Sequence, residues 1–469
     1  MQPFTFDWFV AFFLLSSTNT HRLHALEQAL RAGPQTAQAL SHRLGQDKPA
    51  SQPTVSRALA AAGAQVVAIG AARSTRYAWA DAAREHLRAA VFRVSAEGTL
   101  HELGTLEPVL PSGFVMVQAG GKRIHSDGLP WWLYDMRPQG YLGRAYNQRH
   151  GARLQLPARL NEWSDRHILQ ALLRHGGDLP GNLLLGLDAH DAFVNGPSPA
   201  PIALAERPGA YAQLALAAAR GELPGSSVAG EQPKFTAFAE VQPGRRAHVL
   251  VKFTAATPGP VSQRWRDLLL AEHVALQLLH SHGIPASHSE LLDHGGQRFL
   301  QIERFDRVGA RGRRAQHSLA ALDAEFVGSG ERWPIIVRAL AQQRVVVPES
   351  VRATELLWAF GTLIGNTDMH TGNLAFVSEH GRPYQLAPAY DMTPMAFAPT
   401  AGGEVLARTL SLQVSDQVPG EVWRQALPLA QDYVARMQGE RALSDAFAPC
   451  MEQLQLHVSG AAQRIARLA

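Results

Sequence analysis

The most informative segment of the chain reads Gly365-Asn366-Thr367-Asp368-Met369-His370-Thr371-Gly372-Asn373. It lies between a helical pattern over Thr354–Leu363 and a strand pattern over Leu374–Val377. Asp368 and Asn373 therefore share one loop between a helix and a strand. In such a loop a carboxylate can orient a hydroxyl group and accept its proton, while a nearby amide oxygen can ligate Mg²⁺.

The Asp-x4-Asn spacing of this loop is that of a protein-kinase catalytic loop. Downstream, Asp391 follows a short strand pattern over Tyr384–Leu386. Kinases carry a second metal-binding aspartate at this point in the order of elements, although the Phe-Gly that usually follows it is absent here. Neither feature alone predicts a phosphoryl-transfer site, but together with a glycine loop, a strand lysine and a helix glutamate that precede them in this order along the chain, they do.

A single lysine, Lys252, stands within the apolar strand pattern His248–Phe253. In kinases a strand lysine of this kind holds the nucleotide phosphates and pairs with a glutamate on a helix. Glu272, in the helical pattern Gln263–His280, is the candidate partner. The alternative for Glu272 is a solvated position on the helix surface.

Upstream of that strand, Gly225–Lys234 reads Gly-Ser-Ser-Val-Ala-Gly-Glu-Gln-Pro-Lys. Glu231 stands where a P-loop needs lysine, which disfavours a P-loop NTPase. What remains is a loop of small residues whose backbone N–H groups can approach phosphate, ending in Lys234 before the strand pattern Phe235–Ala239. An ordinary turn is the alternative.

Lysine is scarce in this chain. Of 44 Lys and Arg residues only Lys48, Lys122, Lys234 and Lys252 are lysines, which leaves 40 arginines. Where a plain surface cation is enough the chain uses arginine, so a retained lysine indicates a need for a compact ammonium group. The single cysteine, Cys450, excludes an internal disulfide.

Charge is distributed unevenly along the 469 residues. Residues 1–80 carry seven Lys or Arg against three Asp or Glu, whereas the remaining residues are balanced. A basic head on a neutral body suggests a polyanionic partner. The apolar run Trp8–Leu15 is too short to span a bilayer and lacks the cationic start of a signal peptide, so we expect a cytoplasmic protein with no membrane partner.

The N-terminal head has the element order of a winged helix-turn-helix. Helical patterns and short strand patterns alternate with Gly and Pro stops over His21–Ala32, Thr36–Leu44, Gln52–Ala62, Gln65–Ile69 and Arg76–Trp79. The third helix would read DNA and the loop between the strands would be the wing, with contacts from Gln52, Thr54, Ser56, Arg57, Arg73 and Arg76. The connection between the second and third helices is longer than the usual turn. A helical domain that binds only its own chain is the alternative.

Four segments together resemble the HipA family of bacterial serine/threonine kinase toxins. They are Ser227–Lys234, Glu303–Arg307, Asn366–Asn373 and Ala389–Asp391, and Leu129–Gly143 resembles the same family's N-lobe. The resemblance covers about residues 90–440. Together with the fused head, it makes the whole chain similar to the YjjJ-type members of that family.

The resemblance implies a role for each matched residue. Asp368 would be the catalytic base, Asn373 and Asp391 the Mg²⁺ ligands, and Ser227 a site of autophosphorylation that ejects the loop and silences the kinase. The ATP site would be formed by Ala229, Gly230, Glu231, Gln232, Pro233, Lys234, Lys252, Glu303, Arg304, Phe305, His370, Thr371, Gly372, Asn373 and Asp391. Within this set, Glu303–Phe305 would be the hinge beside adenine, unless that segment is only a salt-bridged strand end.

The expected fold class is α+β: a winged helix-turn-helix over residues 1–82, a mixed α/β kinase N-lobe with the glycine loop over 83–305, and a helical C-lobe with the catalytic loop over 306–469. Within the N-lobe, the Ala- and Pro-rich segment Asp188–Pro208 predicts a surface loop.

The expected function is an ATP- and Mg²⁺-dependent serine/threonine protein kinase whose fused head binds DNA for autoregulation or self-inhibition. The resemblance implies a protein substrate such as an aminoacyl-tRNA synthetase. The fused head suggests that a separate antitoxin is unnecessary. The alternative is a DNA-binding regulator whose kinase-like body only senses nucleotide.

Overall fold

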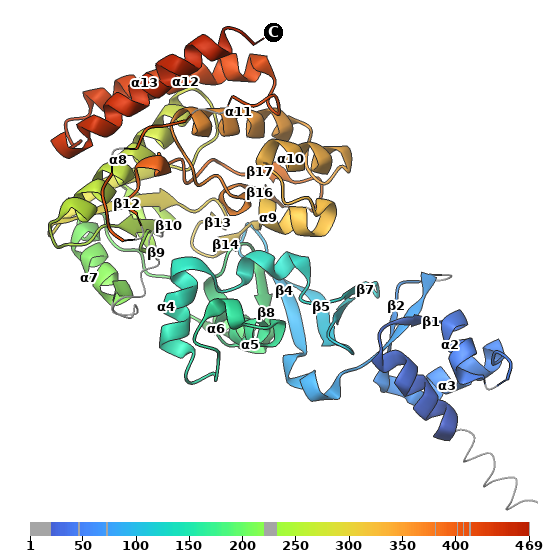
Figure 1. Cartoon of the computed structure of the whole chain (residues 1–469). Coiled ribbons are helices and arrows are strands. Elements are labelled where there is room, and N and C mark those ends of the chain that lie inside the picture. Colours follow the sequence, from blue (N-terminus) through green and yellow to red (C-terminus); the bar gives the residue numbers. More distant parts are fainter. Residues whose placement is uncertain are drawn as a thin grey trace, which may run out of the picture.

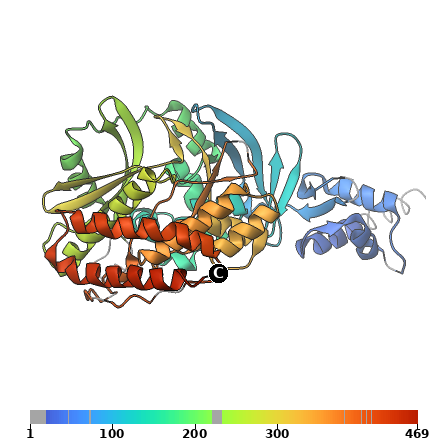
Figure 2. The ribbon, with the colours of Figure 1, turned by 90° about the horizontal axis from the view of Figure 1, so that it is seen from above.

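The computed structural model describes residues 20–45, 47–71, 74–219, 232–379, 381–400, 402–406, 408–411 and 414–468. The chain forms three successive parts, which we call the head (residues 1–82), the middle part (83–206) and the C-terminal part (207–469) (Figure 1). Figures 1 and 2 both show the head extending from one end of the molecule, beside the middle part. The apolar run Trp8–Leu15 lies outside the described residues.

The head consists of helices packed on a small antiparallel sheet. A helix over 20–31 is followed by β1 (Gln35–Thr36), α2 (Ala37–Leu44), α3 (Gln52–Ala62), β2 (Val66–Ile69) and β3 (Arg76–Trp79). The sheet order is β1-β3-β2. The helices and the β2–β3 hairpin agree with the predicted element order. The two-residue β1 was not predicted, because two residues are too few to show a strand period.

The helices of the head bury apolar side chains on their inner faces. Leu26, Leu30, Leu40 and Val55 are buried together and form its core. Thr36 caps α2 by accepting a hydrogen bond from the backbone N–H of Ala39 at 3.2 Å. On α3, Gln52, Ser56 and Arg57 are exposed, whereas Thr54 is half-buried.

The middle part is built on a five-stranded antiparallel sheet of order β7-β6-β5-β4-β8. Its elements are β4 (Ala89–Val94), β5 (Leu100–Pro108), β6 (Phe114–Gln118), β7 (Arg123–Ser126), α4 (Gly140–His150), α5 (Asp165–His175), β8 (Leu183–Leu185) and α6 (Gly186–Asn195). Leu106, Phe114, Leu133 and Leu169 are buried in its core.

The predicted surface loop Asp188–Pro208 is wrong over its first eight and its last two residues, which are helical. Residues 186–195 form α6, and α7 (Arg207–Ala219) already begins at Arg207. Ala189 is buried against strand residues of the sheet, and alanine is the strongest helix former. The loop is confined to the stretch between the two helices, which contains Pro197, Pro199 and Pro201.

The C-terminal part has two sheets and a helical layer (Figure 1). The first sheet, of order β11-β12-β10-β9, contains β9 (Lys234–Gln242), β10 (Arg245–Phe253), β11 (Ser289–His294) and β12 (Gln297–Glu303). The helix α7 packs on one face of this sheet and α8 (Pro260–Ser281) on the other. A two-stranded ribbon, β13 (Arg307–Val308) and β14 (Gly312–Arg313), follows.

The second sheet and the remaining helices form the largest core. The sheet order is β15-β16-β17, from β15 (Ala315–Ser318), β16 (Ala375–Ser378) and β17 (Gln385–Leu386). The helices are α9 (Leu319–Leu322), α10 (Trp333–Gln342), α11 (Glu349–Leu363), α12 (Gly420–Gly439) and α13 (Ala448–Ile465). Trp333, Phe360, Trp423 and Phe447 are buried in this core. In the described part of the chain, no helix is both long and apolar enough to cross a membrane.

Candidate active site

The centre of the candidate site is Lys252 on β10. Val251 and Phe253 belong to the apolar core under α7, so strand alternation turns Lys252 to the opposite face, where α8 lies. Its Nζ is 2.7 Å from both carboxylate oxygens of Glu272 on α8. It also contacts the carboxylate of Asp391. The structure thus brings together three residues that lie up to 139 positions apart in the chain.

The charges around Lys252 set different states for the two carboxylates. Burial raises the pKa of Glu272 above its ordinary value, despite the neighbouring ammonium group. Burial would also raise the pKa of Asp391, but the positive charges of Lys252 and Lys234 hold it below its ordinary value. Although burial opposes its charge, the two carboxylates raise the pKa of Lys252. Lys252 and Asp391 are therefore charged at neutral pH.

Lys234 on β9 lies directly opposite Lys252 in the register of the two antiparallel strands. Residues opposite each other in such a pair lie on the same face of the sheet. Just before it, Gln232 donates a hydrogen bond from Nε2 to the backbone oxygen of Phe253, and its buried Oε1 has no partner in the described chain. The backbone oxygen of Pro233 accepts from the N–H of Phe253 at 3.0 Å. The predicted residues Ser227, Ala229, Gly230 and Glu231 lie outside the described residues, as does Arg73 in the head.

Asp391 is held in an unusual backbone conformation. Its φ is 53°, in the left-handed region that residues with a side chain seldom adopt. Asn366 donates from Nδ2 to the backbone oxygen of Asp391 at 3.0 Å, and the Tyr390 hydroxyl donates to the backbone oxygen of Gly372 at 2.9 Å. Strained residues held in this way are concentrated at functional sites.

The loop of Asp368 is organised by two amide side chains. Asn366 Oδ1 accepts from the backbone N–H of Asp368 at 3.0 Å, and Asn373 Nδ2 donates to the backbone oxygen of Asp368 at 2.8 Å. The Asp368 side chain is exposed, and its carboxylate has no hydrogen bond or ion pair with any residue the structure describes. The loop therefore presents a free carboxylate beside the amide of Asn373.

Two of the predicted nucleotide contacts, His370 and Gly372, have structural roles in this loop. His370 caps the short helix Thr371–Asn373 by accepting from the N–H of Gly372 at 3.0 Å. The backbone oxygen of His370 accepts from Nε1 of the buried Trp333, also at 3.0 Å. These contacts attach the loop to the core of the C-terminal part.

The predicted hinge residues point in different directions. Glu303 pairs with Arg245 on β10 through two contacts of 2.6 and 2.8 Å. Arg304 is engaged by Asp178 and Asp306. Phe305 instead packs against Tyr390, with 5.7 Å between the ring centroids. Of the three residues, only Phe305 contacts the loop that carries Asp391.

Sequence reasoning gave no role to Asn366, Tyr390 or Thr393. Asn366 joins the loop of Asp368 to the backbone of Asp391, and the Thr393 hydroxyl donates to Glu272 at 2.9 Å. The only signal for them was their place within or next to the matched segments. The contacts that their side chains make with Asp391, Gly372 and Glu272 span 18 to 121 positions, so local patterns do not reveal them.

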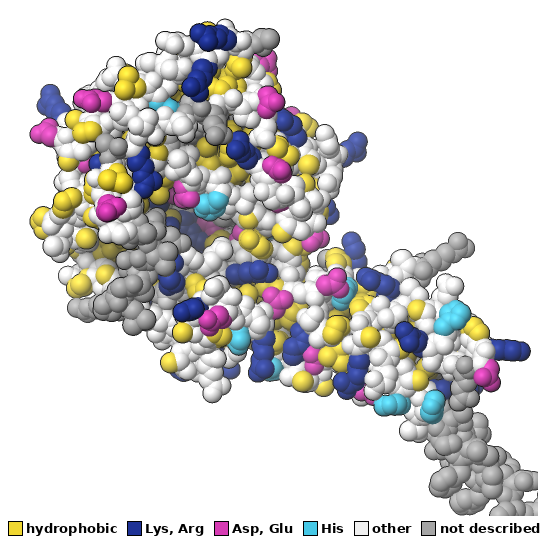
Figure 3. Space-filling model, viewed as in Figure 1, with side chains coloured by type: hydrophobic (Ala, Val, Ile, Leu, Met, Phe, Trp, Pro, Cys, Tyr) yellow, Lys and Arg dark blue, Asp and Glu magenta, His cyan; other side chains and the backbone are white. Residues whose placement is uncertain are grey.

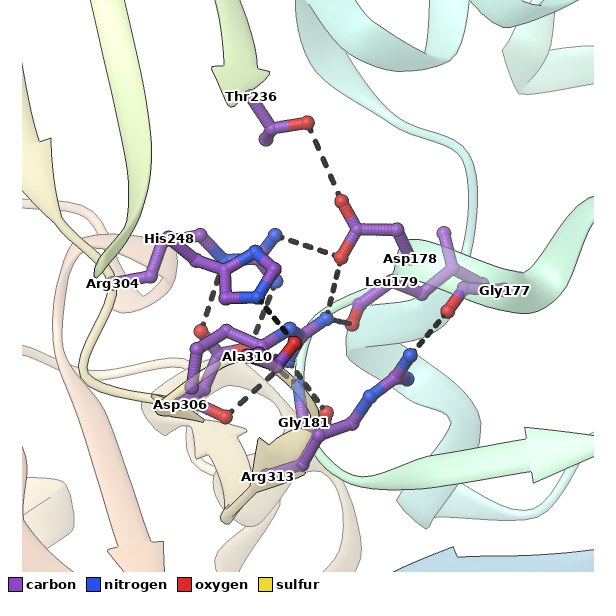
Figure 4. A network of polar contacts seen from close by, with 11 residues as sticks. Gly177, Asp178, Leu179, Gly181, Thr236, His248, Arg304, Asp306, Ala310 and Arg313 are labelled. Carbon is purple, nitrogen blue, oxygen red and sulfur yellow. Dashed lines mark hydrogen bonds and ion pairs between the residues drawn. The ribbon is translucent and has the colours of Figure 1, made fainter. Parts of the chain in front are cut away.

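A charged network, buried except at Asp178, joins the segment after β12 to the middle part (Figure 4). Asp178 accepts from Arg304 at 2.9 Å and from Arg307 at 2.7 Å. Asp306 binds both arginines as well and accepts from the backbone N–H of Gly181 at 3.0 Å. We call these four charged residues and Gly181 the interdomain latch. It fixes the segment that carries Phe305 relative to the middle part.

Arg313 adds a third positive charge beside the latch (Figure 4). It donates to the backbone oxygen of Gly177 at 2.5 Å, while its buried Nη1 has no partner among the described residues. Burial and the charge of Arg307 lower its pKa to about 10. Three arginines face two aspartates, so removing the charge of either aspartate should destabilise the latch.

Replacing Asp178 by Asn should lower the free energy of unfolding by about 1–2 kcal/mol at pH 7. The expected loss is smaller than for a fully buried charged hydrogen bond, because the side chain of Asp178 is half exposed and solvent screens its charge. Burial would raise the pKa of Asp178, but Arg304 and Arg307 lower it well below its ordinary value. Its stabilising effect is therefore present above about pH 4 and lost as the pH falls further. Urea unfolding at pH 7 and pH 3 should show a smaller acid loss in the variant than in the wild type.

The matched control for this measurement is Asp188→Asn in the same part of the chain. Asp188 pairs with Arg174 at 3.3 Å, but both side chains are about two-thirds exposed. This variant should unfold like the wild type at both pH values. Equal stability of the two variants at pH 7 would show that the latch contributes nothing.

Comparison with known proteins adds independent evidence. Residues 85–194 match the family model described as "YjjJ-like toxin, middle domain", and residues 226–455 match the "HipA-like C-terminal domain". Toxin YjjJ of Escherichia coli (strain K12) is 39% identical over 445 residues, which are 94% of this chain and 99% of that protein.

Two solved structures are similar to this chain at low sequence identity. One is the complex of HipA, HipB and operator DNA from a Shewanella oneidensis MR-1 toxin–antitoxin system, with TM-score 0.47, 14% identity, and coverage of 78% of this chain and 95% of that one. The other is the Helicobacter pylori proinflammatory kinase CtkA, with TM-score 0.37, 13% identity, and coverage of 52% and 94%.

The family resemblance predicted from the four motif segments is thus confirmed. The mixed arrangement of sheets and helices also agrees with the expected fold class. Because a relative at 39% identity extends over nearly the whole sequence, the chain belongs to the YjjJ-like toxin family, and its C-terminal part carries a HipA-like domain.

Proposed function

We propose that this chain is a toxin of the kinase type, which transfers the γ-phosphate of ATP to a serine or threonine hydroxyl of a protein. The observation that carries the proposal is the meeting of Lys252, Glu272 and Asp391 in one buried cluster. Asn366 connects this cluster directly to the loop of Asp368 and Asn373. Phosphoryl transfer needs a lysine that holds the phosphates, carboxylate and amide ligands for Mg²⁺ and a residue that orients the substrate hydroxyl, and these residues could supply all three.

The residues present suit a nucleotide bound with a divalent cation. Asp391 is ionised, and its side chain is 28% exposed beside two lysines. Carboxylate and amide oxygens are the ligands that Mg²⁺ prefers. Asn373 uses Nδ2 for the backbone of Asp368, so its Oδ1 remains available as a ligand. The unpaired buried Oε1 of Gln232 marks a polar position beside the strand that carries Lys252. Asn373 and Asp391 would hold Mg²⁺, and Lys252 and Lys234 would hold the phosphates.

In this proposal each residue performs a defined step. Asp368 orients the substrate hydroxyl and accepts its proton, because its carboxylate is exposed and free of other partners. Glu272 holds the ammonium group of Lys252 in place through both of its oxygens. ATP bound with Mg²⁺ would supply the phosphoryl group that is transferred. Autophosphorylation at Ser227 remains a prediction.

The direct test is transfer of phosphate from labelled ATP by the purified full chain with Mg²⁺. We expect incorporation into the chain itself or into a cell extract, and none after chelation of the cation. Comparing the phosphoproteomes of cells that make the wild type or Asp368→Ala would identify the substrate, for which the family resemblance suggests an aminoacyl-tRNA synthetase. A chain that binds ATP and transfers no phosphate to any target would favour a nucleotide-sensing regulator instead.

A second candidate function, DNA binding by the head, is favoured by the surface of α3. Gln52, Ser56 and Arg57 are exposed on this helix, while Val55 and Ala58 on its other side are buried. The β2–β3 hairpin follows the helices and pairs with β1, which agrees with the element order of a winged helix-turn-helix. Such a head could regulate its own gene or restrain the kinase within the same chain, without a separate antitoxin.

Replacing Arg57 by Ala should weaken binding of the full chain to duplex DNA about 8-fold at 0.1 M salt. The removal of one phosphate contact should also reduce the slope of log K against log salt by about 0.9. Fluorescence anisotropy over a range of salt concentrations measures both quantities. Arg31→Ala, on a helix outside the proposed interface, is the control. A wild-type chain whose DNA affinity does not respond to salt would contradict a DNA-binding head.

A further inference from the structure

The hairpin formed by β6 and β7 carries Lys122, to which neither the kinase nor the winged helix assigns a role. Residues 118–126 contain Lys122 and Arg123 but no Asp or Glu. Both side chains are exposed, and within the described chain neither makes a hydrogen bond or ion pair. The hairpin belongs to the middle part, outside the predicted DNA-binding head.

This hairpin is attached directly to the head. The backbone N–H of Gly70, at the start of the wing, donates to the backbone oxygen of Arg123 at 3.2 Å. The head and the middle part also share a buried apolar cluster. It contains Val67, Ile69 and Ala78 of the head and Val109 and Val115 of the middle part. The apolar cluster and the backbone contact make the hairpin a rigid neighbour of the wing.

The basic groups of hairpin and wing lie close together. Arg123 and His125 are on the same face of β7, because alternate residues of a strand share a face. Burial lowers the pKa of His125, the neighbouring Asp127 opposes this, and the charge of Arg76 on β3 adds to the lowering, so Arg76 lies near His125. Arg76 is itself exposed. Figure 3 shows Lys and Arg side chains on the surface where the head meets the middle part.

We propose that the β6–β7 hairpin is a second wing, which contacts the phosphate backbone of the same DNA duplex through Lys122 and Arg123. This inference rests on the proposed DNA binding by the head and extends the interface to the middle part. In a winged helix the wing lies beside the recognition helix, close to the bound DNA. The basic β6–β7 hairpin, held next to the wing, would therefore lie close to the phosphate backbone of the same duplex. Contacts made by a preformed hairpin carry little ordering cost.

The test compares the full-length wild type with the double variant Lys122→Gln/Arg123→Gln on a duplex of about 30 base pairs, or three helical turns. Loss of two phosphate contacts should reduce the slope of log K against log salt by about 1.8 and weaken binding up to about 60-fold at 0.1 M salt. Because both side chains are exposed and unpaired, urea unfolding of the variant should match that of the wild type.

The matched control is Arg149→Gln/Arg166→Gln, which removes the same charge from exposed positions on α4 and α5 of the middle part. Figure 1 places these helices away from the head. This control should keep the wild-type salt slope. If the hairpin variant also keeps the salt slope of the wild type while Arg57→Ala binds DNA more weakly, the second wing is refuted. DNA binding by the head then still stands. If the wild type itself binds no duplex, the proposed DNA binding fails first.

Discussion

Replacement of Asp368 by Ala should lower the rate of phosphate transfer about 10²–10⁴-fold, the range typical for loss of a general base. The side chain lies at the surface of its loop and is not used to hold the fold together. Its backbone N–H and oxygen make the contacts that shape the loop, and these remain after the substitution. The variant should therefore fold normally and bind ATP with nearly unchanged affinity.

The measurements are steady-state transfer of labelled phosphate and a fluorescence titration with ATP. Asp368→Asn, which keeps the shape but cannot accept the proton, should behave like Asp368→Ala in transfer. Asp445→Ala is the matched control, since Asp445 is an exposed aspartate in a short helix between α12 and α13, far along the chain from the loop. Full activity in Asp368→Ala would refute the assigned role. Loss of ATP binding with the activity would assign Asp368 to binding instead.

Replacement of Lys252 by Arg should lower phosphate transfer by at least about 10²-fold, although the charge is conserved. The ammonium group fits between the carboxylates of Glu272 and Asp391 at a position that is 5% exposed. A planar guanidinium is larger and needs a different arrangement of acceptors. Overpacking of a buried site costs about 1–3 kcal/mol, and a displaced charged donor commonly costs 10²–10³-fold in rate.

Because a damaged site can also damage the fold, urea unfolding accompanies the activity measurement. Lys252→Met should be the more destabilised variant, by about 3–5 kcal/mol, because it leaves two carboxylates without their cation. Lys122→Arg, at an exposed lysine, should leave transfer and stability unchanged. If Lys252→Arg transferred phosphate at the wild-type rate, the inference drawn from the scarcity of lysine would be wrong.

Local patterns predicted much of the site because its parts lie in regular elements. The alternation of β10 placed Lys252 on the face opposite Val251, and the helical pattern of α8 presented Glu272 on a continuous helix. Their pairing followed from the order of motifs along the chain. The bounds of α3 and of the loop before β16 also agree with the sequence patterns.

Other features could not be read from local patterns. The direction of Arg304 depends on Asp178, 126 positions earlier, so a hinge facing the nucleotide and a salt-bridged strand end looked alike in sequence. The conformation of Asp391 depends on Asn366 and on the packing of Tyr390 against Phe305. The attachment of the hairpin to the head depends on a backbone contact that has no side-chain signature.

The amino-acid sequence by itself determined the family, the elements that carry the site and the types of residue available for its chemistry. These follow from short periods and from motifs within a few residues of one another. Only the tertiary structure decided that Lys252 contacts both Glu272 and Asp391, that Asn366 joins the two loops, and that Arg123 of the hairpin contacts Gly70 at the start of the wing. Burial and contacts between residues far apart in the chain fix these arrangements. The pKa values of the carboxylates follow from them, because a pKa depends on burial and on neighbouring charges that the order of the chain does not reveal.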